Sequence, residues 1–137
     1  MKFTLLVQTS KRAEFIDITS RLQSVVSENG VQEGYIILFV GHTTAGVTIN
    51  EGADPAVRED MLNILEGFVP QNRSYFHLEG NSDSHLKASL MGASETVFIE
   101  NGRLFLGTWQ AIYFCEFDGP RKRQITCKVF STKEEST

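Results

Sequence analysis

The stretch Thr96-Val-Phe-Ile-Glu-Asn-Gly102 indicates an antiparallel β fold, because an apolar-rich run from Arg103 to Phe117 follows it directly. Asn and Gly both tolerate the positive φ angles of a type I′ turn, and Asn-Gly between apolar runs is the strongest short-range signal for a β-hairpin. We therefore expect residues 103–117 to form one long strand that pairs antiparallel with residues 96–100.

Further strands are expected on both sides of this hairpin. Phe3, Leu5 and Val7 alternate with polar residues, as in a half-buried strand, and the run 35–40 has the apolar content of a buried strand. The other expected strands cover residues 15–18, 45–50 and 124–130, with a short one starting at Tyr75.

Two longer helices are predicted between these strands. The first starts after Asp17 or Thr19, either of which can cap it, and ends at Asn29-Gly30. The second starts at Asp54-Pro55, an N-cap followed by proline at the first helical position. Its apolar stripe, expected to face the core, consists of Val57, Met61, Ile64, Leu65 and Phe68. A further helical turn is expected around residues 84–91. The fold class is therefore α+β, an antiparallel or mixed β-sandwich with two longer helices.

Length and composition indicate one domain, residues 1–137, with 41% hydrophobic and 22% charged residues. The net charge of -4 argues against nucleic acid as a partner. The longest apolar run, residues 34–41, is too short to span a bilayer, so no membrane association is expected. No signal peptide is evident, and Cys115 and Cys127 are expected to be reduced core thiols of a cytoplasmic protein.

Three histidines, His42, His77 and His85, fall where strand ends or loops are expected. Neutral imidazoles are common ligands of catalytic zinc, so a shared metal site is one interpretation. The alternative is three unrelated histidines, because no short motif fixes two of them on one element. Glu51 and Glu79 have no evident capping role and are the better candidates for acid-base chemistry. Asp54 and Asp83 are expected to cap helices.

Residues 79–89 form a glycine-containing loop that leads into the expected helical turn, with Lys87 and Ser89 just inside its start. Helix N-termini favour anions, so this segment is a candidate phosphate site, although it lacks the spacing of established phosphate-binding loops. The basic cluster Arg121-Lys-Arg123 is expected to be a solvated turn.

Three long motifs taken together resemble the YjbQ-like family, also described as secondary thiamine-phosphate synthases. They begin with His42-Thr-Thr-Ala-Gly, His77-Leu-Glu-Gly-Asn and Asn101-Gly-Arg-Leu-Phe, and the resemblance covers nearly the whole chain. It implies a YjbQ-like β-sandwich fold assembled as a homotrimer. It also implies a polar pocket near the subunit boundaries, with His42, His77 and His85 as metal ligands.

The activity implied by this resemblance is that of a transferase in thiamine biosynthesis, as either its main or a side activity. A pyrimidine diphosphate and a thiazole phosphate would combine to thiamine phosphate and pyrophosphate. The partner is thus a phosphorylated small molecule, and the cofactor a divalent metal, zinc rather than magnesium because imidazoles suit zinc better. The implied catalytic residues are His42, Glu51, His77, His85 and Lys87, and the implied phosphate-binding residues are Thr43, Arg58, Gly80, Asn81 and Ser89.

Two alternatives stay open. The first is a metal-dependent hydrolase that acts on a phosphorylated or carbonyl substrate through the same pocket. The second is a non-catalytic sensor or carrier that binds a phosphorylated metabolite or a metal, signals through its trimer contacts and needs no activated water.

Overall fold

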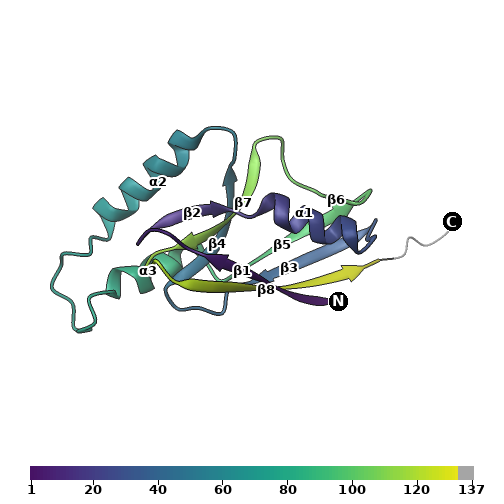
Figure 1. The fold of residues 1–137 in the computed structure, drawn as a ribbon. Coiled ribbons are helices and arrows are strands. Elements are labelled where there is room, and N and C mark those ends of the chain that lie inside the picture. The colour runs from purple at the N-terminus through teal and green to yellow at the C-terminus, as the bar shows by residue number, and fades with distance from the viewer. Residues whose placement is uncertain (133–137) are drawn as a thin grey trace.

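A computed structural model describes residues 1–132, and it contains two antiparallel sheets and three helices (Figure 1). The chain runs β1 (Lys2–Gln8), β2 (Glu14–Asp17), α1 (Thr19–Glu28), β3 (Gly34–Phe39), β4 (Ala45–Glu51), α2 (Pro55–Phe68), α3 (Ser82–Met91), β5 (Ser94–Glu100), β6 (Arg103–Leu104), β7 (Gln110–Glu116) and β8 (Lys122–Ser131). The larger sheet has the order β1-β8-β3-β5-β6 and the smaller one β2-β7-β4. The predicted α+β class is confirmed.

Strand β7 lies between two apolar cores, because its side chains alternate between the faces of the smaller sheet. Ile112 and Phe114 point into the main core, together with the inner faces of the larger sheet and of α1. Tyr113 and Cys115 belong to a second core, to which α2 and α3 contribute. The smaller sheet is therefore a middle layer, with the larger sheet and α1 on one side and the other two helices on the other.

The Asn-Gly hairpin is confirmed, but the predicted long strand 103–117 is wrong. Asn101 and Gly102 have φ angles of 52° and 76°, as a tight turn requires. After the hairpin only β6 pairs with β5, and the chain then crosses to the smaller sheet to form β7. The crossing includes a local turn in which the Gly107 N–H donates to Gln110 Oε1.

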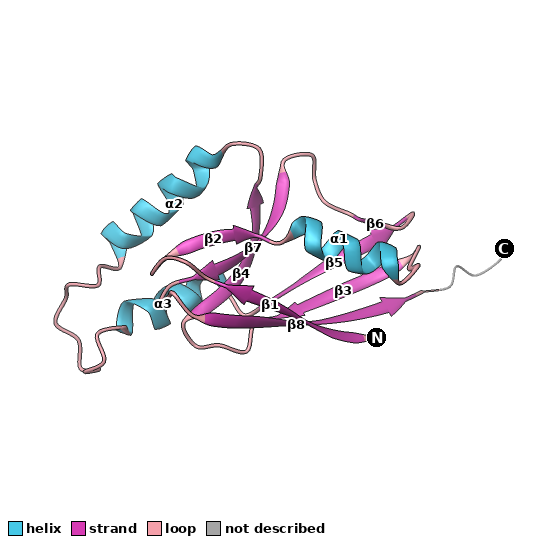
Figure 2. Ribbon diagram, in the orientation of Figure 1, coloured by secondary structure: helices cyan, strands magenta, loops and turns pink. Residues whose placement is uncertain are grey.

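The segment between α2 and α3 also differs from expectation. No strand forms at Tyr75, which lies in the long loop that Figure 2 shows between these helices. The expected helical turn is a ten-residue helix, α3, so the fold has a third helix beyond the two predicted. Helix α1 is capped by Ile18 rather than by Asp17 or Thr19, although the Asp17 carboxylate accepts a hydrogen bond from the Thr19 N–H.

Helix α2 starts as predicted, with the Asp54 side chain accepting from the Ala56 N–H and Pro55 at the first position. Its apolar stripe is less buried than predicted, because α2 has no fully buried residue and Ile64 and Phe68 are 68% and 74% exposed. No helix in residues 1–132 is long and apolar enough to cross a membrane.

Candidate functional site

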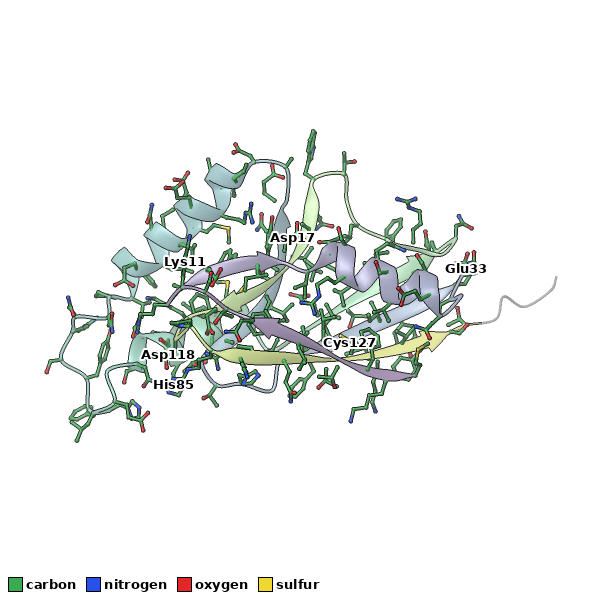
Figure 3. The ribbon with its side chains drawn as sticks, in the orientation of Figure 1. Lys11, Asp17, Glu33, His85, Asp118 and Cys127 are labelled. Carbon is green, nitrogen blue, oxygen red and sulfur yellow. The ribbon has the colours of Figure 1, made fainter. Side chains whose placement is uncertain are left out.

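An open pocket of about 500 Å³ lies between the loop before β4 and helix α3. His42 and Thr43 come from the loop, and His85 and Ser89 come from the helix. His85 and Ser89 are four residues apart, so the helical repeat places them on the same face. The remaining lining residues are small, namely Ala45, Ala88, Gly92 and Ala93. The pocket lies at the end of the molecule where Figure 3 labels His85 and Asp118.

The ring of His42 is held by the backbone of β8. The Gln124 N–H donates to His42 Nε2 at 3.2 Å, so the neutral ring carries its proton on Nδ1. Burial lowers the pKa of His42, and the positive charge of Arg123 lowers it further. The neutral form is therefore favoured, with Nδ1–H as its hydrogen-bond donor.

His77 lies beside the pocket rather than in its lining. Its ring meets that of His85 edge to face with 5.6 Å between centroids, and its Nε2 is 3.5 Å from a carboxylate oxygen of Glu79. Among residues 1–132, no three His, Cys, Asp or Glu side chains are placed to hold one metal ion. With His42 Nε2 already accepting a backbone N–H, the three imidazoles do not fit a shared metal centre.

Lys87 points away from the pocket into a buried ionic cluster. Its ammonium lies 2.9 Å from Asp83 and 2.6 Å from Glu66, and Asp83 also binds Arg12 through two hydrogen bonds. Burial raises the pKa of Asp83, but the hydrogen bonds from Arg12 and Lys87 outweigh it, so the net shift is downward. Asp83 is therefore an ion-pair partner and not the predicted helix cap. The helix begins at Ser82, so Lys87 lies in its second turn.

Asn81 is the N-cap residue of α3, and its side chain contacts the strand end after β7. Its Nδ2 donates to an Asp118 carboxylate oxygen at 2.9 Å, while its Oδ1 is buried without a hydrogen-bond partner in the described part of the chain. Gly80 precedes it with a φ of 78°, and its carbonyl accepts from Gln71. Neither residue lines the pocket.

Glu51 and Arg58 lie at a different place in the fold. The Glu51 carboxylate accepts from the Ala53 N–H and its carbonyl accepts from the Tyr113 hydroxyl. The Arg58 guanidinium lies over the Tyr113 ring, 5.2 Å from its centroid. Of the ten implied site residues, the pocket thus gathers His42, Thr43, His85 and Ser89, with His77 adjacent.

A buried ion pair between Arg123 and Glu116 joins the two sheets behind His42. Arg123 Nε donates to Glu116 Oε1 at 2.9 Å, and the same guanidinium donates to the Thr44 hydroxyl. The prediction of a solvated turn is wrong for Arg123, which is 5% exposed. The alternation of β8 could have predicted this burial, because Arg123, Ile125 and Cys127 are two residues apart and so lie on the same face of the strand.

A protein-family model described as UPF0047 protein YjbQ-like matches residues 3–132. The chain belongs to this family. It is 49% identical over 133 residues to a UPF0047 protein of Methanocaldococcus jannaschii, a match that covers 97% of this chain and 96% of the relative. It is 50% identical over 127 residues to the UPF0047 protein YugU of Bacillus subtilis, covering 92% and 95% of the two chains.

Solved structures of relatives have the same fold. A YjbQ/UPF0047 family protein of Clostridium acetobutylicum superposes with a TM-score of 0.90 at 51% identity, covering 93% of this chain and 99% of that one. A protein of Sulfolobus solfataricus superposes with a TM-score of 0.90 at 32% identity, covering 96% and 97%, and is described as of unknown function.

These comparisons overturn the implied thiamine phosphate synthase activity. The relatives are named only as UPF0047 proteins, without an enzymatic activity, and the Sulfolobus neighbour is described as a protein of unknown function. The three-histidine metal centre on which the reaction depended is also not formed by residues 1–132. The prediction of a transferase is therefore wrong. The alternative of a metal-dependent hydrolase needs the same metal centre and loses its support as well.

Proposed function

We propose that the protein binds the phosphoryl group of a small molecule in the pocket formed by His42, Thr43, His85 and Ser89. The observation that carries the proposal is the convergence of two imidazoles and two hydroxyl side chains on one open pocket. Histidine N–H groups and the Thr43 hydroxyl donate hydrogen bonds to phosphoryl oxygens. The Ser89 hydroxyl, which donates to the His85 carbonyl in this structure, does so after its O–H turns towards the ligand. The small residues around them leave room for an anion between the loop and α3.

The charges around His42 also favour an anion. The positive charges of Arg123 and Arg121 lower the pKa of His42. The negative charge of Glu116 raises this pKa, but by less than Arg123 lowers it. The ring is oriented before any ligand arrives, because the Gln124 N–H holds its Nε2. An oriented donor in a positive potential binds an oxyanion without the entropic cost of ordering that side chain.

Calorimetry with inorganic phosphate and glycerol phosphate tests this proposal. We expect His42→Ala and His85→Ala each to weaken binding about tenfold, the loss of one charge-assisted hydrogen bond. Arg58→Ala is the matched control, because it removes a cation that lies over Tyr113 and outside the pocket. Equal affinities of the wild type and both histidine variants would reject the site.

Zinc binding by this chain stays a prediction, which elemental analysis of the purified protein checks.

We further propose the homotrimer implied by the family resemblance, with the outer face of the larger sheet as its contact surface. Phe98, Tyr35 and Phe130 are cross-strand neighbours on β5, β3 and β8, and Tyr35 stacks on Phe130 with 5.0 Å between ring centroids. Phe39 is 51% exposed on the same face. Contiguous exposed apolar surface of this kind is typical of protein–protein contacts.

We propose a cytoplasmic location because of the state of the two cysteines. Cys115 and Cys127 are both free and buried. Burial raises the pKa of Cys127 to about 12 and shifts that of Cys115 in the same direction. Two unreactive reduced thiols are typical of proteins kept in a reducing compartment.

A further inference from the structure

A second cavity, of about 360 Å³, lies between α2 and the segment that precedes β2. It shares no lining residue with the His42 pocket. Leu62, Leu65, Ala13 and Phe117 give it apolar walls, and the ammonium of Lys87 lies among its lining groups. The other lining residues are polar or charged, namely Arg12, Glu59, Asn63, Glu66 and Gln71. The cavity thus offers an apolar wall beside charged groups, and its volume lies in the range of small-molecule sites, roughly 300–1,000 Å³.

The charges of Arg12, Lys87 and Asp83 beside this cavity do not balance without α2. Arg12 and Lys87 are cations and Asp83 is an anion, so the three together carry a net charge of +1. Both Asp83 oxygens are already engaged, one by Arg12 and the other by Arg12 and Lys87. The Arg12 side chain is 30% exposed to water, whereas the Lys87 side chain is 3% exposed, so a second anion is most favourable at Lys87.

Glu66 of α2 supplies that partner, and it is the exchangeable member of the cluster. Its carboxylate lies 2.6 Å from the Lys87 ammonium, yet its side chain is 54% exposed, whereas the Lys87 and Asp83 side chains are 3% and 0% exposed. The helix that carries it has no fully buried residue. Releasing Glu66 to water therefore costs less than releasing either of the other two groups.

We propose that this cavity binds a small monocarboxylic acid whose carboxylate replaces Glu66 on Lys87 and whose apolar body lies against Leu62, Leu65 and Phe117. The position of Glu66 shows that a carboxylate oxygen reaches the ammonium from this side. A singly charged ligand matches the net charge of +1. A phosphate dianion would exceed it and would meet the carboxylate of Glu59, which lines the cavity.

Titration with hexanoate, followed by amide chemical shifts and calorimetry, tests this second site. In the wild type Glu66 competes for Lys87, so Glu66→Gln removes an internal competitor and is expected to tighten hexanoate binding at least about tenfold. Lys87 keeps its ion pair with Asp83 in this variant, and circular dichroism checks that the variant is folded. Asp60→Asn is the matched control, because it removes one negative charge from the same helix outside the cavity. It should leave the hexanoate affinity unchanged.

Hexanol and hexylamine are the matched ligands without a carboxylate, and neither should reproduce the shifts at Ala13 and Leu62. Equal hexanoate affinity in the wild type and Glu66→Gln would overturn the proposal. Hexanol binding as tightly as hexanoate would also overturn it. His85→Ala should leave the hexanoate titration unchanged, so failure at this cavity is distinguishable from failure of phosphoryl binding at the His42 pocket.

Discussion

Glu116 is a fully buried carboxylate whose pairing with Arg123 joins the two sheets. Burial raises the pKa of Glu116, but hydrogen bonds from Arg123 and Thr9 outweigh it, and the net shift is downward. A lowered folded-state pKa stabilises the protein above the unfolded-state pKa of about 4.3, and this stability is lost as the pH falls through the folded-state value.

Glu116→Gln is therefore expected to lower the free energy of unfolding by about 3 kcal/mol at pH 7, because it leaves Arg123 buried without its anion. Below about pH 4 the difference from the wild type should shrink, as the wild-type carboxyl is protonated too. Urea unfolding at several pH values measures both effects. Glu95→Gln, on β5, serves as the control. A pH-independent difference between Glu116→Gln and the wild type would contradict the role of this ion pair.

At the scale of single residues, the pocket members were identifiable but their partners were not. The sequence places His42 and His85 where strand ends or loops are expected, and Thr43 and Ser89 lie in the same family motifs. The expected helix start at Ser84, two residues after the observed one, wrongly puts Lys87 at the phosphate site. Whether a lysine faces a ligand or a buried Asp83 depends on helix phase, which a weakly amphipathic stretch such as α3 does not reveal.

Among the elements, α2 combines a well-formed start with weak attachment. The Asp54 side chain accepts from the Ala56 N–H at 2.9 Å, and no residue of the helix is fully buried. Its stability therefore depends on local terms more than that of α1, whose Leu22 and Val26 are buried in the main core.

Asp54→Ala is expected to cost about 1 kcal/mol, the usual effect of removing an N-cap side chain. The loss should fall mainly on α2, so its amide hydrogens should exchange faster while those of α1 change little. Hydrogen exchange resolved by residue measures this. Asp60→Ala, a mid-helix change in the same element, should leave the exchange rates close to wild type. Uniform acceleration across all helices would argue against a locally stabilised α2.

Element types could be predicted well because apolar periodicity is a local property. The break in the expected strand 103–117 could not, since the chain passes from one sheet to the other there and both halves keep the apolar content of strands. The exposure of the α2 stripe was missed for a related reason. An apolar face indicates that something covers it, but the covering surface need not belong to the same chain.

For the whole molecule, the exposed aromatic face of the larger sheet predicts self-association. Sedimentation equilibrium should give about three times the chain mass of 15.4 kDa. Phe98→Glu places a charge on this face, next to Tyr35, and should shift the protein towards the monomer. Ser24→Glu is the control, because it adds the same charge to an exposed polar position on α1, which packs on the other face of the larger sheet. A monomeric wild type would refute the trimer, and an unchanged mass for Phe98→Glu would refute this contact surface.

The most direct test of phosphoryl binding is a crystal structure of the protein grown with tungstate, a heavy tetrahedral oxyanion whose position an anomalous difference map reveals. We expect a tungstate peak between His42 Nδ1 and the side chains of His85 and Ser89, and its loss in crystals of His85→Ala. Tungstate peaks confined to other surfaces of the wild-type protein, with the His42 pocket empty, would rule out phosphoryl binding at this pocket.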